Sequence, residues 1–277
     1  IVAGNPGIIA FVPSKFIEKD FPGHLLKDES ISFDEVFAGK EWFPTATPAP
    51  QFGFLPLITG TLWVSFFAIL FALPFGLSVA VYMSEVADHR TRSFLKPVIE
   101  LLSGIPSVVY GFFGLIVIVP LIQKVFNLPV GETGLAGSIV LAIMALPTII
   151  TVSEDAMRNC PRAMREASLA LGATRWQTIY KVVIPFSISG ITSGVVLGIG
   201  RAIGETMAVI MVAGNQTWMP QGLFKGLRTM TANIVIEMGY ATDLHREALI
   251  ATGVVLFVFI LIINLCVSAL KRRAEDE

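Results

Sequence analysis

Residues 133–153 read TGLAGSIVLAIMALPTIITVS, a run without a charged side chain between Glu132 and Glu154. A bilayer core of about 30 Å requires roughly 20 apolar residues of helix, so this run is long enough to cross it. A helix is the expected form because every backbone polar group inside lipid must find its partner within the segment. These residues therefore predict a membrane-spanning helix.

Apolar runs of similar length lie on both sides of this segment. They cover residues 57–82, 101–123, 182–210 and 248–270. The composition agrees, since 15% of the 277 residues are charged, against about 25% in a soluble domain. The sequence therefore predicts an all-α polytopic membrane protein with five visible spans.

Lysine and arginine are concentrated in alternate connections between the predicted spans. The loop after the first span holds three, the connection at 153–185 holds five and the tail holds three. The positive-inside rule assigns these connections to the cytoplasmic side of a cell membrane. We therefore expect an extracytoplasmic segment at 1–56, a transmembrane domain at 57–270 and a cytoplasmic tail at 271–277. With a net charge of −1, the chain lacks the basic surface that a nucleic-acid partner requires.

The connection at 153–185 is predicted to contain two short helices separated by a turn. Pro161 suits the first turn of a helix, and Gly172 suits the left-handed position that ends one. Thr174 with Gln177 three residues later is the pattern of a capping box, which begins a second helix. The pattern alone leaves two interpretations open, an amphipathic loop on the lipid headgroups or a docking element for a cytoplasmic partner.

A resemblance to a known family favours docking. Glu-Ala-Ser at 166–168, Gly172 and Val-Val-Ile-Pro at 182–185 resemble the EAA loop of ABC importer permeases. The departures from the family pattern, at positions 168, 182 and 184, are modest. The resemblance implies a coupling helix that sits in a cleft of a cytoplasmic ATPase. The residues that it assigns to ATPase coupling are Glu166, Ala167, Ser168 and Gly172.

The fourth predicted span carries two charged residues, Arg201 and Glu205. Arg201 lies about 15 residues beyond Phe186, roughly 22 Å into the span and near the bilayer midplane. Glu205 follows four residues later, on the same face of a continuous helix. A charge at that depth costs at least about 2.5–3.5 kcal/mol, so the pair must face protein or a water-filled cavity. Three functions stay open: a structural ion pair, an anion site in which Glu205 holds Arg201, and a proton carrier at Glu205.

Small residues and one proline add detail to the predicted bundle. Glycines recur every four residues at Gly190, Gly194 and Gly198, and again on a neighbouring face at Gly200 and Gly204. Such ridges let transmembrane helices approach closely. Proline 106 lacks a backbone donor and is expected to kink or break the second span, either as a packing kink or as part of a cavity lining.

The wider sequence resembles the phosphate-specific ABC permease family. The stretches at 101–114, 146–156 and 200–209 carry this resemblance, and Tyr110 with Thr206 favours the PstC-type subunit over its PstA-type partner. The resemblance implies a type I, MetI-like helical bundle. Members of that family usually have six spans, so a first span is expected to be missing before Ile1.

The resemblance also implies a function and a set of partners. It implies the permease subunit of an ATP-driven phosphate importer, with Arg201 and Glu205 in the substrate pathway. The implied partners are a PstA-type permease, a PstB-type ATPase dimer and an extracytoplasmic phosphate-binding protein. The sequence lacks a Gly-x-x-x-x-Gly-Lys-Ser/Thr loop and a histidine or cysteine cluster, so neither enzyme activity nor a metal or cofactor is expected. A permease for another oxyanion and a proton-coupled secondary transporter remain the alternatives.

Overall fold

The computed structural model describes residues 33–46 and 50–276, with the side chains of 36–46 and 50–265. Most of the expected extracytoplasmic segment, residues 1–32 and 47–49, and the last residue of the tail lie outside the described residues. The first elements are α1 (Phe33–Ala38), β1 (Trp42–Phe43), β2 (Gln51–Phe52), α2 (Leu55–Val81), η3 (Tyr82–Val86), α3 (His89–Gly104), α4 (Ser107–Phe113), η4 (Gly114–Ile118) and α5 (Val119–Val125). The remaining ones are α6 (Gly134–Arg158), α7 (Arg162–Ala170), α8 (Arg175–Thr178), η5 (Ile179–Val183), α9 (Ile184–Gly204), α10 (Met207–Val212), α11 (Met230–Glu237) and α12 (Asp243–Asp276).

Helices dominate the described residues, and the η segments are π-helical turns that continue their neighbours. Five helical stretches are long and apolar enough to cross a membrane, and they lie at 55–86, 107–125, 134–158, 175–204 and 243–265. The predicted all-α polytopic fold is therefore confirmed. The two strands form one small antiparallel pair, with Trp42 opposite Phe52.

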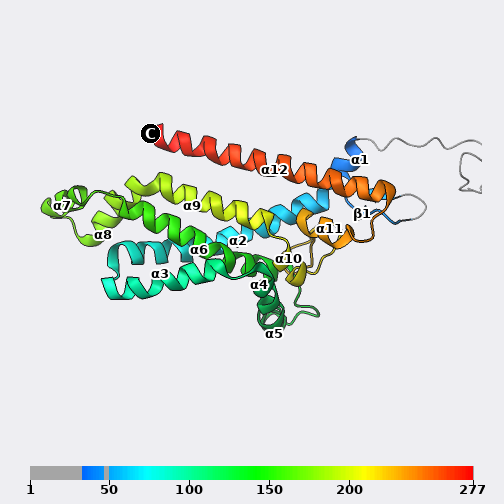
Figure 1. Cartoon of the computed structure of the whole chain (residues 1–277), viewed down its shortest axis with the longest axis horizontal. Coiled ribbons are helices and arrows are strands. Elements are labelled where there is room, and N and C mark those ends of the chain that lie inside the picture. Colours follow the sequence, from blue (N-terminus) through cyan, green and yellow to red (C-terminus); the bar gives the residue numbers. More distant parts are fainter. Residues whose placement is uncertain (1–32, 47–49, 277) are drawn as a thin grey trace, which may run out of the picture.

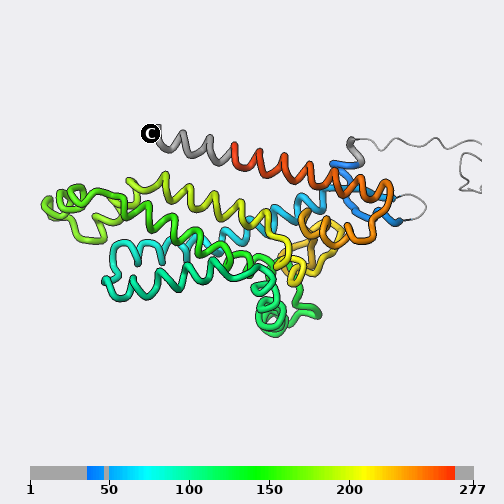
Figure 2. Tube along the Cα trace, in the orientation of Figure 1, coloured from blue at the N-terminus to red at the C-terminus, as the bar shows by residue number. Residues whose placement is uncertain are grey.

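Helix α6 is the centre of the bundle. Helices α2, α6, α9 and α12 run along its long axis, and α2 and α9 both pack on α6 (Figure 1 and Figure 2). In its most apolar stretch, 61% of the residues of α6 are buried, against 11% in α12. Lipid therefore has much more access to α12 than to α6.

Glycines explain how closely α9 approaches α6. A Cβ atom at Gly190 would lie 2.3 Å from the Cβ of Ala156, and one at Gly198 would lie 3.0 Å from Ile149. The first predicted ridge is therefore a tight helix contact. The second ridge behaves differently, because a Cβ at Gly200 or Gly204 would meet no described atom within 4 Å.

The second span begins later than the sequence suggested. Helix α3 ends at Gly104, Ile105 and Pro106 are extended, and α4 starts at Ser107 rather than at Leu101. Pro106 cannot donate to the carbonyl of Leu102 as a helical residue would. The Leu102 oxygen instead accepts from the backbone N–H of Ile105, at 3.3 Å, and from the hydroxyl of Tyr110, at 2.8 Å.

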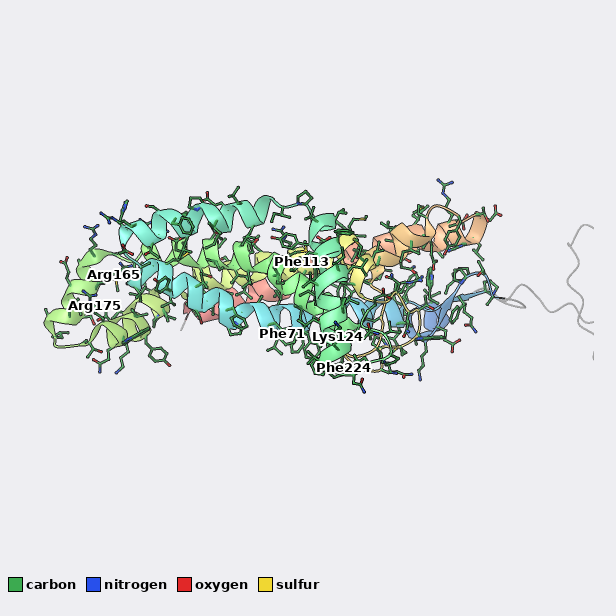
Figure 3. All side chains as sticks on the ribbon, turned by 90° about the horizontal axis from the view of Figure 1, so that it is seen from below. Phe71, Phe113, Lys124, Arg165, Arg175 and Phe224 are labelled. Carbon is green, nitrogen blue, oxygen red and sulfur yellow. The ribbon has the colours of Figure 1, made fainter. Side chains whose placement is uncertain are left out.

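After this break, the chain changes direction. The continuous helix formed by α4, η4 and α5 lies across the bundle rather than along it (Figure 3), where Phe113 and Lys124 mark positions along it. The alternation of the connections agrees with the sequence. Helices α7 and α8 and the start of α3 lie at one end, while α1, β1 and α11 lie at the other (Figure 1).

The glycine contact yields a matched pair of substitutions. We expect Gly190→Ala to destabilise the protein by about 1–3 kcal/mol, because Ala156 has no room to move away from the new methyl group. Gly200→Ala has open space and should be neutral or stabilising by up to about 1 kcal/mol. Thermal unfolding of the two variants in detergent checks this expectation, and equal midpoints would contradict it.

Candidate functional site

Arg201 lies beside a break in the fourth span. Helix α9 ends at Gly204, Glu205 is extended with φ −73° and ψ 134°, and α10 resumes at Met207. Arg201 lies in the last turn of α9, just before this break, and α10 follows the break. Its side chain is partly exposed, and in the described part of the chain it makes no hydrogen bond or ion pair. The structure thus leaves a cation available inside the bundle.

The expected contact between Arg201 and Glu205 is not formed. The sequence argument assumed a continuous helix, whereas the chain leaves helical geometry at Glu205. The Glu205 carboxylate instead accepts a hydrogen bond from the backbone N–H of Ala208, at 3.3 Å. A carboxylate is favourable there because the first turn of a helix presents unpaired N–H groups. Glu205 therefore caps α10 and leaves the charge of Arg201 unneutralised.

The two helix breaks are brought together by close packing of α4 on α10. A Cβ atom at Gly111 would lie 2.9 Å from the Cα of Ala208, and one at Gly114 would lie 2.9 Å from Val212. Tyr110 is close enough for Arg201 to act on it electrostatically. The Pro106 break, which Tyr110 completes, and the Arg201 site are thus neighbours.

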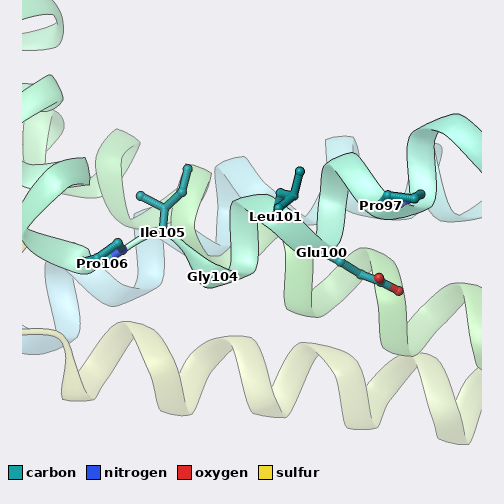
Figure 4. Close-up of a pocket in the computed structure, with 6 residues that line it drawn as sticks. All are labelled: Pro97, Glu100, Leu101, Gly104, Ile105 and Pro106. Atoms are coloured by element: carbon teal, nitrogen blue, oxygen red, sulfur yellow. The ribbon is translucent and has the colours of Figure 1, made fainter.

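A shallow pocket opens at the Pro106 break. It has a volume of about 580 Å³ and is lined by Pro97, Glu100, Leu101, Gly104, Ile105 and Pro106 (Figure 4). Glu100 is its single charged residue, and a Cβ at Gly104 would meet no described atom within 4 Å. The proline break therefore borders a shallow surface pocket.

Thr231 is a contact of this region that the sequence did not reveal. Its hydroxyl donates to the backbone carbonyl of Glu205, at 2.9 Å. Thr231 lies in the first turn of α11. A separation of 26 residues leaves no local pattern from which this hydrogen bond could be found.

The predicted coupling connection has the expected local structure. Helix α7 begins after Pro161, and Gly172 adopts the left-handed conformation with φ +83°. The capping box of Thr174 and Gln177 is present in full at α8. No residue of α7 is buried, and Leu171 is 90% exposed. An apolar side chain that exposed suits a surface that another protein covers.

Polar contacts fix this projecting helix to the bundle. Arg165 forms an ion pair of 2.9 Å with Glu85 and donates to the carbonyl of Met157, at 2.8 Å (Figure 3). The hydroxyl of Ser168 lies 3.0 Å from that of Thr178. Serine at this position therefore gives α7 a link that the family's alanine would lack. The side chains of Glu166 and Ala167 are exposed.

Two buried carboxylates stabilise the two ends of the bundle, and the sequence analysis gave neither a function. At the end with α7, Glu154 is 1% exposed, pairs with Arg92, and has Lys96 at 3.6 Å and Arg158 at 3.9 Å. At the other end, Glu237 is also buried, with 4% exposure. Its partners are Arg228 at 2.5 Å, His245 at 2.8 Å and the indole N–H of Trp42 at 2.8 Å.

The Glu237 cluster also influences its neighbour Tyr240. Burial raises the pKa of the Tyr240 phenol, the Glu237 carboxylate raises this pKa further, and Arg228 partly offsets the effect. The cluster joins residues that are 195 positions apart, from Trp42 to Glu237. It therefore fixes the strand pair and the start of α12 to α11. Within the described residues, no group of acidic, histidine or cysteine side chains could hold a metal ion.

The ion pair of Arg165 leads to a testable difference between two arginines of one helix. Arg165→Ala removes the contact with Glu85, so we expect amide hydrogens of α7 to exchange about tenfold faster. Arg162→Ala is the control, because Arg162 is exposed and has no ion pair in the described residues. Hydrogen–deuterium exchange measures both, and equal protection in the two variants would refute this anchor.

Comparisons with known proteins now place the chain. Residues 72–276 match the family described as binding-protein-dependent transport system inner membrane component. The chain is 44% identical to a probable ABC transporter permease protein YqgH of Bacillus subtilis, with 84% of this chain and 77% of the relative covered. It is 34% identical to the phosphate transport system permease protein PstC of Pasteurella multocida, over 86% and 79%. An inward-facing structure of the MetNI methionine ABC transporter has the same fold, with a TM-score of 0.62 and 20% identity over 79% of this chain and 96% of that one. The chain therefore belongs to the family of binding-protein-dependent transport system inner membrane components.

Proposed function

We propose that this chain is the permease subunit of an ATP-driven phosphate importer, and that the anion passes Arg201. Family membership supports a permease, and several relatives of 34–36% identity bear the name phosphate transport system permease protein PstC. The observation that carries the proposal is the unpaired, partly exposed guanidinium of Arg201 inside the bundle.

The chemistry of arginine fits this cargo. Its guanidinium stays charged at every relevant pH, and its planar fork matches two oxygens of one phosphate. A salt bridge would have to be broken before an anion could use the group. Among the residues that the structure describes, Arg201 has no such partner, and the Glu205 carboxylate caps α10 instead. Gly200 and Gly204 leave the space beside Arg201 unfilled, which supports access for a small anion.

The partners follow from the two ends of the bundle. The exposed helix α7, with Glu166, Ala167 and Ser168 before the turn at Gly172, docks onto a PstB-type ATPase dimer. The end with α7 is cytoplasmic, as its basic residues favour. The opposite end, with α1 and α11, receives phosphate from an extracytoplasmic binding protein. A PstA-type permease completes the wall of the pathway.

In this proposal, transport alternates between two states. Closure of the ATPases on ATP moves α7, opens the pathway outward and admits phosphate from the binding protein. Phosphate then passes Arg201, and it leaves to the cytoplasm after hydrolysis. The chain itself does not hydrolyse ATP. Its contribution to transport is to hold the positive charge of Arg201 where the anion crosses.

Charge removal at Arg201 tests the anion site. We expect Arg201→Gln to lower phosphate uptake by at least about a hundredfold, because a charge-assisted contact inside a low-dielectric site is lost. Arg201→Lys should retain part of the activity, since it keeps the charge without the fork. Uptake into proteoliposomes with the complete transporter measures this effect. Arg246→Gln, at an exposed outer position, is the control. Near-normal uptake by Arg201→Gln would refute the site.

A backbone substitution tests the docking helix. Gly172→Ala forces alanine into a left-handed conformation, at a cost of about 1–2 kcal/mol, and should weaken ATPase capture or uncouple hydrolysis from uptake. Gly222→Ala also introduces backbone strain, into the outer loop at φ +134°, and should leave capture intact. Glu166→Gln changes the exposed face directly and should show the same defect. Normal capture and uptake in both α7 variants would exclude docking there.

A further inference from the structure

We propose that Thr231 is a positioning residue for the Arg201 site, and that it sets the break at Glu205 from outside the span. The inference rests on the proposed function, because it concerns the passage of the anion beside Arg201. Thr231 does not touch that anion in this proposal. It acts through the backbone of Glu205, whose position decides where α9 ends and α10 begins.

The break depends on a hydrogen bond from another element. Once the chain leaves helical geometry, the carbonyl of Glu205 cannot take its usual place in the ladder of α9. An unpaired carbonyl inside the bundle is costly. The hydroxyl of Thr231 supplies the donor, at 2.9 Å. Without this donor, the Glu205 carbonyl would gain a hydrogen-bond partner by moving toward water or back into a helix. Either movement shifts Arg201 in the preceding turn.

Thr231 is held rigidly enough to act as a reference point. It is 7% exposed, and its hydroxyl lies 3.0 Å from that of Thr229. Because Thr231 donates its proton to the Glu205 carbonyl, Thr229 must donate to Thr231. Thr229 in turn caps α11 by accepting from Ala232, and the N–H of Met230 donates to Thr61 of α2, at 3.0 Å. The donor is thus fixed to both α11 and α2.

The C-terminal end of α11 is fixed as well, by the buried charge cluster around Glu237. Glu237 ends this helix and contacts Arg228, His245 and Trp42. Helix α11 therefore runs from the buried charge cluster of the outer end to the break beside Arg201. A shift of the charge cluster around Glu237 is transmitted to Thr231 through α11, which is a short, capped helix. Thr231 consequently relates the position of the outer end to that of the anion site.

The alternative is that the hydroxyl only fills space and stabilises the fold. Valine has nearly the shape of threonine but cannot donate, so Thr231→Val removes the hydrogen bond with little change of packing. Thr231→Ser keeps the hydroxyl and removes the methyl group. Thr252→Val is the matched control, since Thr252 is fully buried and its hydroxyl binds the Ala248 carbonyl of its own helix, at 2.8 Å.

The first measurement is phosphate uptake by the complete transporter, recovered through its ATPase subunit so that only assembled protein counts. We expect Thr231→Val to lower the maximal rate of uptake about tenfold, as the loss of one hydrogen bond at a buried carbonyl allows. Thr231→Ser and Thr252→Val should stay within about twofold of the parent protein. If Thr231→Val does not assemble, Thr231→Ala removes the same hydroxyl.

The second measurement reports on the break itself. A cysteine at position 204, for which the neighbouring space is open, is labelled with a small soluble thiol reagent after Cys160 and Cys266 are replaced by serine. We expect Thr231→Val to change its labelling rate at least about threefold, and Thr252→Val to leave it unchanged.

The outcomes separate the two proposals. Equal defects in Thr231→Ser and Thr231→Val, or unchanged uptake and labelling in Thr231→Val, would overturn the positioning function while Arg201→Gln remains inactive. Normal uptake by Arg201→Gln would instead overturn the anion site, whatever Thr231 does.

Discussion

The structure depends on one constraint, that a backbone polar group inside a lipid-facing bundle needs a partner wherever a helix is interrupted. One break precedes the second span and the other follows α9 of the fourth, and at each break a side-chain hydroxyl donates to a backbone carbonyl. Tyr110 serves the carbonyl of Leu102, and Thr231 serves that of Glu205. The breaks therefore keep a defined geometry, and one of them lies beside the partly exposed side chain of Arg201.

Close helix packing holds the middle of the bundle together, and buried charged residues hold its two ends. In the middle, Gly190 and Gly198 let α9 lie directly against α6. At the ends, single buried carboxylates gather cations from distant segments, Glu154 on one side and Glu237 on the other. A buried acid that lost its cations would be strongly unfavourable, so these clusters hold their segments in one arrangement.

Much of this could be predicted from local patterns, and the failures have a common cause. Charge-free runs predicted the spans, and Pro161, Gly172 and the Thr174 capping box predicted the coupling connection, because each signal lies within a few residues. The pairing of Arg201 with Glu205 failed because spacing along a helix has meaning only while the helix continues. Contacts such as Trp42 with Glu237 were invisible, since no local pattern links such distant positions.

The attachment of α7 has a mechanical consequence. Through the turn at Gly172, this helix is connected to α8 and η5 and then to α9, which carries Arg201 in its last turn. Its Arg165 is also joined to Glu85 at the end of the first span. In the proposed function, a movement of α7 would therefore reach both α9 and the end of the first span, and both of these spans pack on α6. Two spans that are moved at the same end and pack on one common helix tend to tilt together. Under the proposed docking, a movement of the ATPase at α7 would thus be transmitted to two membrane-spanning helices at once.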